Sequence, residues 1–282
     1  MKKRLHILLF IATILSTYYV GLGEGWLGAL WYCGGIMTIL FCHEMGHFLA
    51  ARRHHVPTTL PYFIPVPLPP FGTMGAIIKM QGAMPNRKAL FDVGVAGPLA
   101  GFTIILPAVV IGIFLSPVVD MKSLGAASDS VITLGDSILF QLLSRLIHGP
   151  LKEGQDIILH PLAYAGWVGL LITSINLLPI GQLDGGHVMY AVFGKKSKWA
   201  AWGFYLFFLY VCLFHYFGWL LLIVLLAIFR KHPSTLNDYP GIDRKRKLLA
   251  VLVLILFFLS FTPVPFDIGG GIIPMIRDWI QS

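Results

Sequence analysis

The residues most suited to chemistry form a short segment, His43-Glu44-Met45-Gly46-His47, within a long apolar run. Residues i and i+4 share one face of a helix, so His43 and His47 can present two imidazoles to one metal ion. Glu44 lies beside them, where its carboxylate can take a proton from a water molecule that the ion activates. The segment predicts a metal-dependent hydrolytic site, and a structural polar cluster is the alternative.

A catalytic zinc normally needs a third protein ligand and keeps one position open for water. The chain has only two other glutamates, Glu24 and Glu153. Both lie at or beyond the external boundary of the membrane, on the side away from the histidine pair. Asp184 is the remaining candidate, because it lies at the end of a later apolar run that is on the same side of the membrane as the histidine pair. Pro179 and the glycine pair after Asp184 predict a broken helix there. Alone, Asp184 could equally be a helix-end residue at the membrane interface.

The composition defines the class of protein. Of 282 residues, 12% are charged and 56% are hydrophobic, and the mean hydropathy is +0.77. Soluble domains carry about 25% charged residues, so a soluble fold of this size is excluded. Intrinsic disorder and a transmembrane β-barrel, with its alternating strands, are excluded as well. The sequence predicts an all-α polytopic membrane protein.

Six apolar runs are long enough to span a bilayer. They cover residues 5–23, 25–51, 93–119, 157–183, 199–229 and 248–266. The fifth is too long for one untilted helix, and residues 215–218 form a plausible turn within it, so about seven spans are expected. The expected organisation is an N-terminal helix (1–24), a catalytic core (25–190) and C-terminal helices with a tail (191–282).

The cations are distributed unevenly when loops are assigned to alternate sides. One side collects 17 of the 21 cations, namely Lys2, Lys3, Arg4, Arg52, Arg53, Lys79, Arg87, Lys88, Lys195, Lys196, Lys198, Arg230, Lys231, Arg244, Lys245, Arg246 and Lys247. The other side has Lys122, Arg145, Lys152 and Arg277. Positive loops stay inside, so this bias places the N-terminus in the cytoplasm. The net charge of +8 then indicates topology and contact with membrane lipid rather than nucleic-acid binding.

Two flanking segments carry further expectations. No small-x-small cleavage site follows the first apolar run, so an uncleaved first span is favoured over a signal peptide. The external segment of residues 120–160 is expected to be a loop with a short amphipathic helix at about 137–147. His187, three positions after Asp184, could support the metal ligands, but we expect it to be an exposed residue at the cytoplasmic end.

Residues 43–47 and 176–185 together resemble the paired motifs of the site-2 proteases, which are intramembrane zinc metalloproteases. The family combines H-E-x-x-H with N-x-x-P-x-x-x-L-D-G, and every defining position is filled here. The intervening span carries the family's small residues, Gly97-Pro98-Leu99-Ala100-Gly101. The similarity covers about residues 25–190. The chain resembles a compact bacterial form without a PDZ domain between the motifs or a CBS domain after the core.

The resemblance implies a role for each matched residue. His43, His47 and Asp184 would bind one Zn²⁺ per chain, and Glu44 would be the general base. Asn176 would orient the substrate or stabilise the oxyanion. The substrates would be transmembrane proteins such as anti-sigma factors or membrane-tethered regulators, cut in or near their spans. The location would be the bacterial inner (plasma) membrane, with the active site toward the cytoplasm.

A membrane-associated strand region is expected after the second helix. Repeated prolines forbid a helix from residue 57 to 70, and residues 72–81 are typical of a strand. The resemblance points to Gly72, Thr73, Met74 and Gly75. Our hypothesis is that this edge pairs with an unwound substrate segment. The alternative is a membrane-anchoring loop that does not touch substrate.

Three other classes of protein are alternatives to the protease. A zinc transporter would also place His and Asp in the membrane, but it would not need Glu44 or the second motif. An inactive protein that binds membrane helices would not keep every catalytic position. A metallopeptidase of another family would need a distal glutamate ligand, which the chain lacks.

Overall fold

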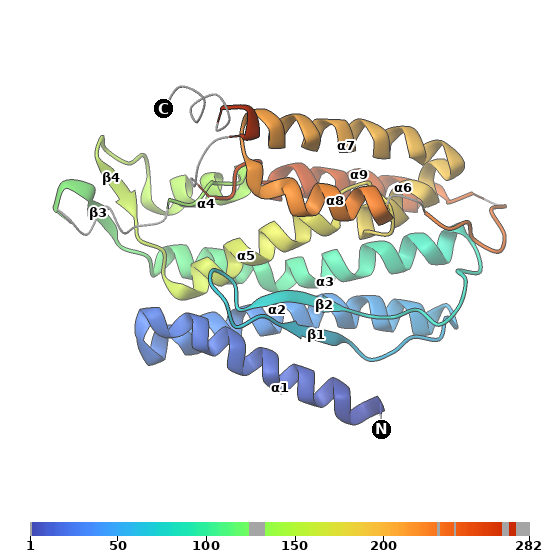
Figure 1. Ribbon diagram of the computed structural model, residues 1–282, viewed down its shortest axis with the longest axis horizontal. Helices are drawn as coiled ribbons and strands as arrows, with labels where there is room; N and C mark the ends of the chain where they lie inside the picture. Colours follow the sequence, from blue (N-terminus) through green and yellow to red (C-terminus); the bar gives the residue numbers. More distant parts are fainter. Residues whose placement is uncertain (1, 124–132, 230–231, 240, 267–270, 275–282) are drawn as a thin grey trace.

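The structure is a computed structural model that describes residues 2–123, 133–229, 232–239, 241–266 and 271–274. Its helices run side by side along the long axis of the molecule (Figure 1). The cations Arg230, Lys231 and Arg277 of the charge argument lie outside the described residues.

Three helices form the centre of the molecule. They are α2 (Gly25–Arg53), α3 (Arg87–Phe114) and α5 (Pro161–Asn176), and each packs against the other two. Helix α1 (Lys2–Gly21) lies on one side of them, and α6 (Asp184–Phe193), α7 (Ser197–Phe214), α8 (Leu220–Phe229) and α9 (Arg244–Ser260) lie on the other (Figure 1). Further elements are α4 (Ile138–His148), short 3-10 turns and the strands β3 (Val118–Asp120) and β4 (Gln155–Ile157).

A two-stranded hairpin overlaps α2 in the view of Figure 1, with its first strand on the side of α1. Its strands are β1 (Tyr62–Pro65) and β2 (Thr73–Ile77), which pair antiparallel. Hydroxyl groups on three helices hold the turn between the strands by donating hydrogen bonds to its carbonyl groups. Tyr32 donates to the carbonyl of Phe71, Tyr164 to that of Pro70, and Ser16 to that of Gly72. No described strand pairs with the other edge of β2.

The predicted spans agree with the helices except near Asp184 and at several ends. Helix α3 begins six residues before the predicted start at 93, because the Asn86 side chain accepts a hydrogen bond from the Ala89 amide and caps the helix at the charged end. The extent of the span predicted for residues 157–183 is wrong, because α5 ends at Asn176 and a new helix, α6, begins at Asp184; the break predicted around Pro179 is confirmed. The turn expected at 215–218 is confirmed, since α7 ends at Phe214.

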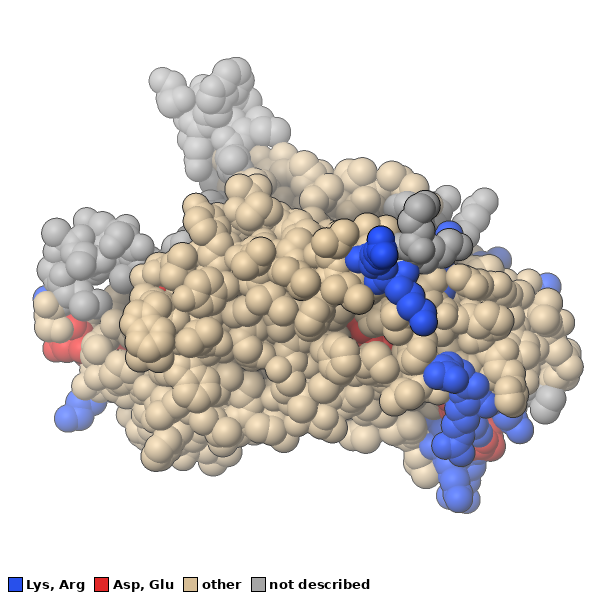
Figure 2. All heavy atoms as spheres, turned by 90° about the horizontal axis from the view of Figure 1, so that it is seen from below, with Lys and Arg blue, Asp and Glu red and all other residues tan. Residues whose placement is uncertain are grey.

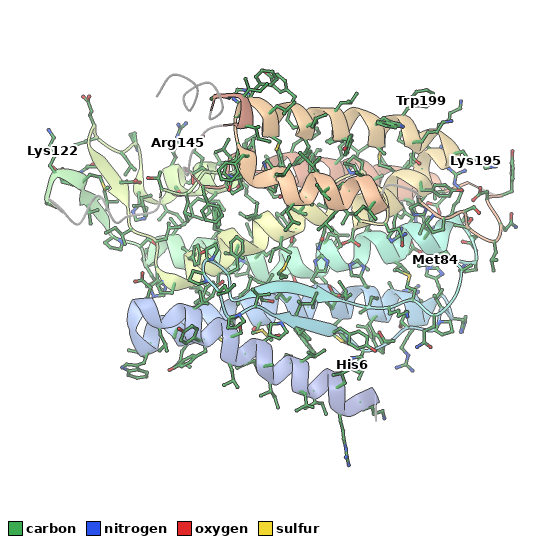
Figure 3. The ribbon with its side chains drawn as sticks, viewed as in Figure 1. His6, Met84, Lys122, Arg145, Lys195 and Trp199 are labelled. Atoms are coloured by element: carbon green, nitrogen blue, oxygen red, sulfur yellow. The ribbon has the colours of Figure 1, made fainter. Side chains whose placement is uncertain are left out.

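The surface has an uncharged belt between two charged ends. Lys and Arg side chains gather toward the ends in Figure 2, and the middle is almost free of charge. Lys122 and Arg145 lie at the end that carries α4, β3 and β4, whereas Lys195 lies at the opposite end (Figure 3). Within the described part of the chain, three stretches are long and apolar enough to cross a membrane, Lys3–Arg53, Arg87–Phe114 and Asp184–Phe214, and the first contains both α1 and α2.

Helix α9 is tied to the core by an ionic cluster. Arg246 donates to both carboxylate oxygens of Asp92 on α3, from Nε at 2.7 Å and Nη2 at 2.5 Å. His54, just after α2, contacts the same carboxylate at 2.8 Å. A two-point contact between a guanidinium and a carboxylate fixes orientation as well as distance. The cluster therefore joins α9 to α2 and α3 at the end nearer the histidine pair.

Candidate metal centre

Close packing of α2 against α3 leaves room for the two histidines. A Cβ atom placed on Gly97 would lie 2.0 Å from Nε2 of His47, and one on Gly101 would lie 3.3 Å from Nδ1 of His43. At Gly46, an added Cβ would meet the backbone oxygen of Ala96 at 2.4 Å. Small residues on facing helices allow this approach. The Gly97–Gly101 segment thus shapes the space around the imidazoles.

Three buried ligand atoms form a nearly equilateral triangle. Nε2 of His43 and Nε2 of His47 are 3.1 Å apart, and they lie 3.3 Å and 3.2 Å from Oδ2 of Asp184. Both imidazoles are buried, and Asp184 is partly buried. Among the described residues these three form the one group of histidine, cysteine and acidic side chains able to hold a metal ion.

The donor set fits zinc. Bonds of 2.0–2.1 Å in a tetrahedral site place ligand atoms about 3.3 Å apart, close to the observed edges. Oδ2 of Asp184 is also buried without a hydrogen-bond partner among the described residues, despite the two nearby ring nitrogens. A buried carboxylate oxygen left in that state is costly, and a cation held by all three atoms removes the cost. Two imidazoles and one carboxylate leave the fourth position of a catalytic zinc site open.

The tautomer of His47 is set by the neighbouring helix. Nδ1 of His47 lies 2.8 Å from the backbone oxygen of Val93 on α3. Nδ1 must therefore carry the proton and donate it to that carbonyl, and in the neutral ring Nε2 keeps its lone pair. Contacts of this kind orient metal-binding histidines and fix their rings.

Asp184 reaches the histidines because the chain reverses after α5. Residues 177–183 form a turn-rich loop, and Asp184 is the first residue of α6. A Cβ on Gly185 would lie 1.9 Å from the backbone oxygen of Leu177, and one on Gly186 would lie 2.3 Å from that of Gly181. Only glycine lets the first turn of α6 pack against the loop at these distances.

Glu44 lies between the triangle and the hairpin. Its side chain is buried, with 4% of its surface exposed. His47, Asp184 and the backbone N–H of Ile78, which lies just beyond β2, all act electrostatically on its carboxylate. A carboxylate in this place can exchange protons with a molecule bound at the triangle.

Of the other predicted residues, Asn176 lies beside the triangle, and the remaining four belong to the hairpin. Asn176, the last residue of α5, places Nδ2 3.5 Å from Nε2 of His43. Thr73, Met74 and Gly75 lie on β2, and Gly72 immediately precedes it. Met74 is 63% exposed, whereas the Thr73 side chain is buried and its hydroxyl accepts a hydrogen bond from the Gly75 amide.

Sequence reasoning missed a second histidine contact. The expectation that His187 is exposed is wrong: it is partly buried, and its Nδ1 lies 2.7 Å from Nε2 of His232. His232 in turn places Nδ1 2.6 Å from the backbone oxygen of Pro233, so His187 is the donor in the histidine pair. The two histidines are 45 positions apart in the sequence, which left no local sequence signal for this contact.

Comparison with known proteins gives the same answer as the geometry. Residues 31–213, more than half of the chain, match the family model described as Peptidase family M50. The chain is 35% identical over 238 residues to "Probable zinc metalloprotease EGY1, chloroplastic" of Arabidopsis thaliana, covering 82% of this chain and 42% of that protein. It is 34% identical over 249 residues to "Probable zinc metalloprotease EGY2, chloroplastic" of the same plant, covering 86% and 44%.

A third relative is "Probable zinc metalloprotease EGY1, chloroplastic" of Oryza sativa subsp. japonica, which is 38% identical over 168 residues, covering 58% of this chain and 28% of that protein. The chain spans less than half the length of each of these three curated relatives. Because the family model covers both histidines and Asp184, the match includes the whole triangle. The chain therefore belongs to peptidase family M50, the site-2 family of zinc metalloproteases.

Proposed function

We propose that this protein is an intramembrane zinc metalloprotease that hydrolyses peptide bonds in or near the transmembrane segments of other membrane proteins. The observation that carries the proposal is the buried triangle of His43, His47 and Asp184, with Glu44 beside it. The triangle lies within helices that are apolar enough to cross a membrane. Ionisable groups at such depth are costly and mark functional sites.

In this mechanism His43, His47 and Asp184 hold the zinc ion. When bound, zinc lowers the pKa of a water molecule to about 7 and polarises the scissile carbonyl. Glu44 accepts the proton of the attacking water at its carboxylate and later returns it to the amine nitrogen that leaves. Asn176 donates from Nδ2 to the carbonyl oxygen of the substrate, which orients the peptide bond and stabilises developing negative charge.

The hairpin supplies the substrate with a backbone partner. A helical substrate hides its carbonyl groups, so the cleaved segment must be extended. The outer edge of β2 is not paired with any described strand, and the chain just beyond β2 reaches Glu44 through Ile78. An extended peptide added to this edge would run toward the general base.

The proposal also places the chain in its membrane. Seven helices would span it, α1, α2, α3, α5, α7, α8 and α9, with the cationic end on the cytoplasmic side. The core of residues 25–190 carries the chemistry, flanked by the helix of 1–24 and the helices and tail of 191–282. We propose a bacterial plasma membrane, with anti-sigma factors or other membrane-tethered regulators as substrates.

Reconstitution in lipid vesicles tests the proposal against zinc transport. The full chain is incorporated with a labelled single-span peptide that contains a helix-weakening segment, and a zinc-sensitive dye is trapped inside. We expect the peptide to be cut, cleavage to stop after zinc chelation and to return when zinc is added. Zinc entry into the vesicles without any cleavage would favour a transporter instead.

Proline at Met74 tests the role of β2. Met74→Pro removes a backbone N–H from the strand, so we expect cleavage to fall about tenfold while zinc content stays at one per chain. Met74→Ala, which keeps the N–H and removes the side chain, is the matched control and should change cleavage less than threefold. Unchanged cleavage in the proline variant would mean that the hairpin only anchors the chain in the membrane.

A further inference from the structure

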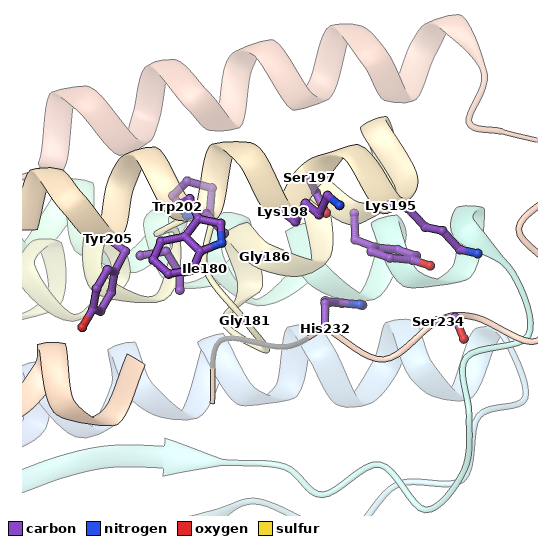
Figure 4. Close-up of a pocket in the computed structure, with 13 residues that line it drawn as sticks. Ile180, Gly181, Gly186, Lys195, Ser197, Lys198, Trp202, Tyr205, His232 and Ser234 are labelled. Carbon is purple, nitrogen blue, oxygen red and sulfur yellow. The ribbon is translucent and has the colours of Figure 1, made fainter. Parts of the chain in front are cut away.

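A cavity of about 590 Å³ lies beside the metal centre, between α6, α7 and the chain at residues 232–234 (Figure 4). One wall is the backbone of Pro179, Ile180 and Gly181, in the loop that leads to Asp184. The opposite wall belongs to α7. Neither the three ligands nor Glu44 lines it, so this cavity is a separate site.

The mouth of the cavity is positively charged. Lys195 and Lys198 line it, and no carboxylate is among the described lining residues. Asp238 interacts electrostatically with both Lys195 and Arg87, and its oxygens already accept hydrogen bonds from Thr235 and Tyr190. The cations around the mouth therefore outnumber the acidic groups.

Neutral polar groups complete the mouth. The hydroxyl groups of Ser197 and Ser234 line it together with the ring of His232. Burial lowers the pKa of His232 below its usual range, so at neutral pH this ring adds hydrogen bonding but no positive charge. Two ammonium groups and two hydroxyl groups are donors that suit a phosphate.

The polarity of the cavity changes along α7. Lys195 stands at the charged end of the molecule (Figure 3), and Trp202 and Tyr205 follow Lys198 along the helix. At 1.5 Å per residue, Tyr205 lies about 10 Å further into the uncharged belt than Lys198. Aromatic side chains at this level are typical of the membrane interface. The cavity thus offers a cationic mouth and an apolar interior, which is the pattern of an anionic amphiphile.

We propose that this cavity binds an anionic phospholipid, with its phosphate at Lys195 and Lys198 and its glycerol and first acyl carbons against Trp202 and Tyr205. The volume is within the range of small-molecule sites. Basic pockets between helices on the cytoplasmic side of a membrane are suited to such headgroups. A bound lipid would also brace the loop of residues 179–181, which leads to Asp184. Proteolysis is not needed for the binding itself.

The test uses the full chain in nanodiscs of phosphatidylcholine that contain a small fraction of photoactivatable phosphatidylglycerol. Labelling of the peptides that line the cavity is measured against the lipid fraction by mass spectrometry. We expect Lys195→Gln with Lys198→Gln to raise the half-saturating fraction about tenfold. The matched pair Lys245→Gln with Lys247→Gln removes the same charge at the same end without lining the cavity, and should shift it less than twofold.

Two further arms make the result decisive. Ala201→Phe fills the cavity and keeps both lysines, so it should also lower labelling, and it decides alone if circular dichroism shows that the double glutamine variant is misfolded. Glycerol 3-phosphate and inorganic phosphate should not compete at millimolar concentration. Undiminished labelling in the folded variants, or an equal loss in the control pair, would overturn the proposal. Effective competition by either soluble phosphate would replace the lipid with a free phosphate compound.

Discussion

Replacing Glu44 with glutamine is expected to reduce peptide cleavage by a factor of about 10² to 10⁴ while one zinc ion per chain is retained. Glutamine keeps the size of the side chain and can still contact the backbone at Ile78, but it cannot accept a proton from water. The ligand atoms of His43, His47 and Asp184 are untouched. Cleavage of a labelled single-span peptide and zinc content by atomic absorption are measured on the same preparation.

Asp184→Ala is the informative comparison for Glu44→Gln. It removes Oδ2 of Asp184, one of the three ligand atoms, so cleavage and zinc content should fall together. The two variants therefore separate loss of proton transfer from loss of the metal. If Glu44→Gln also lost its zinc, Glu44 would be a ligand or a structural support rather than the general base.

Alanine at Gly97 is expected to disrupt the site as strongly as the loss of a ligand, although Gly97 does no chemistry itself. The added methyl group would lie 2.0 Å from Nε2 of His47, the atom of that ring that completes the triangle. The His47 ring is held by its bond to the carbonyl of Val93, so it cannot move aside without losing that bond. We expect zinc content below one-tenth per chain and cleavage at least a hundredfold lower, measured as above.

Alanine substitutions at two other glycines are the controls for Gly97→Ala. At Gly101 the added methyl group would lie 3.3 Å from Nδ1 of His43, a distance that a small shift can relieve, so alanine there should keep most of the zinc. Gly34, on α2, has open space around its Cβ position, and Gly34→Ala should leave zinc content and cleavage unchanged. An equal effect at all three positions would mean that helix packing, rather than access to His47, controls the site.

The chemistry of the site could be predicted from local sequence patterns and from the small number of acidic residues in the apolar runs. Helical spacing placed His43 and His47 on one face, and the lack of other acidic groups in the apolar runs pointed to Asp184. Both arguments need only the sequence and the expectation that its apolar runs span a membrane. The proximity they predicted is confirmed by the structure, which brings the three ligand atoms together.

Features that depend on how distant segments meet could not be predicted. The carbonyl of Val93 orients His47, and Gly97 makes room for it, only because of the register between α2 and α3. Pro179 and the glycine pair predicted a broken helix near Asp184, but hydropathy alone could not show that α5 already ends at Asn176 and that Asp184 begins a new helix. Strand β1 was missed because its partner lies across a proline-rich turn.

The contact between Asp92 and Arg246 limits how the peptidase can be shortened. Asp92 directly precedes Val93, the residue that orients His47, and Arg246 belongs to a helix far beyond the second motif. A fragment cut after residue 190 would keep every catalytic group but would leave that carboxylate without its guanidinium partner. We therefore expect such a fragment to hold the α3 segment beside His47 less firmly than the full chain does. Work with fragments should retain α9 at least through its first turns.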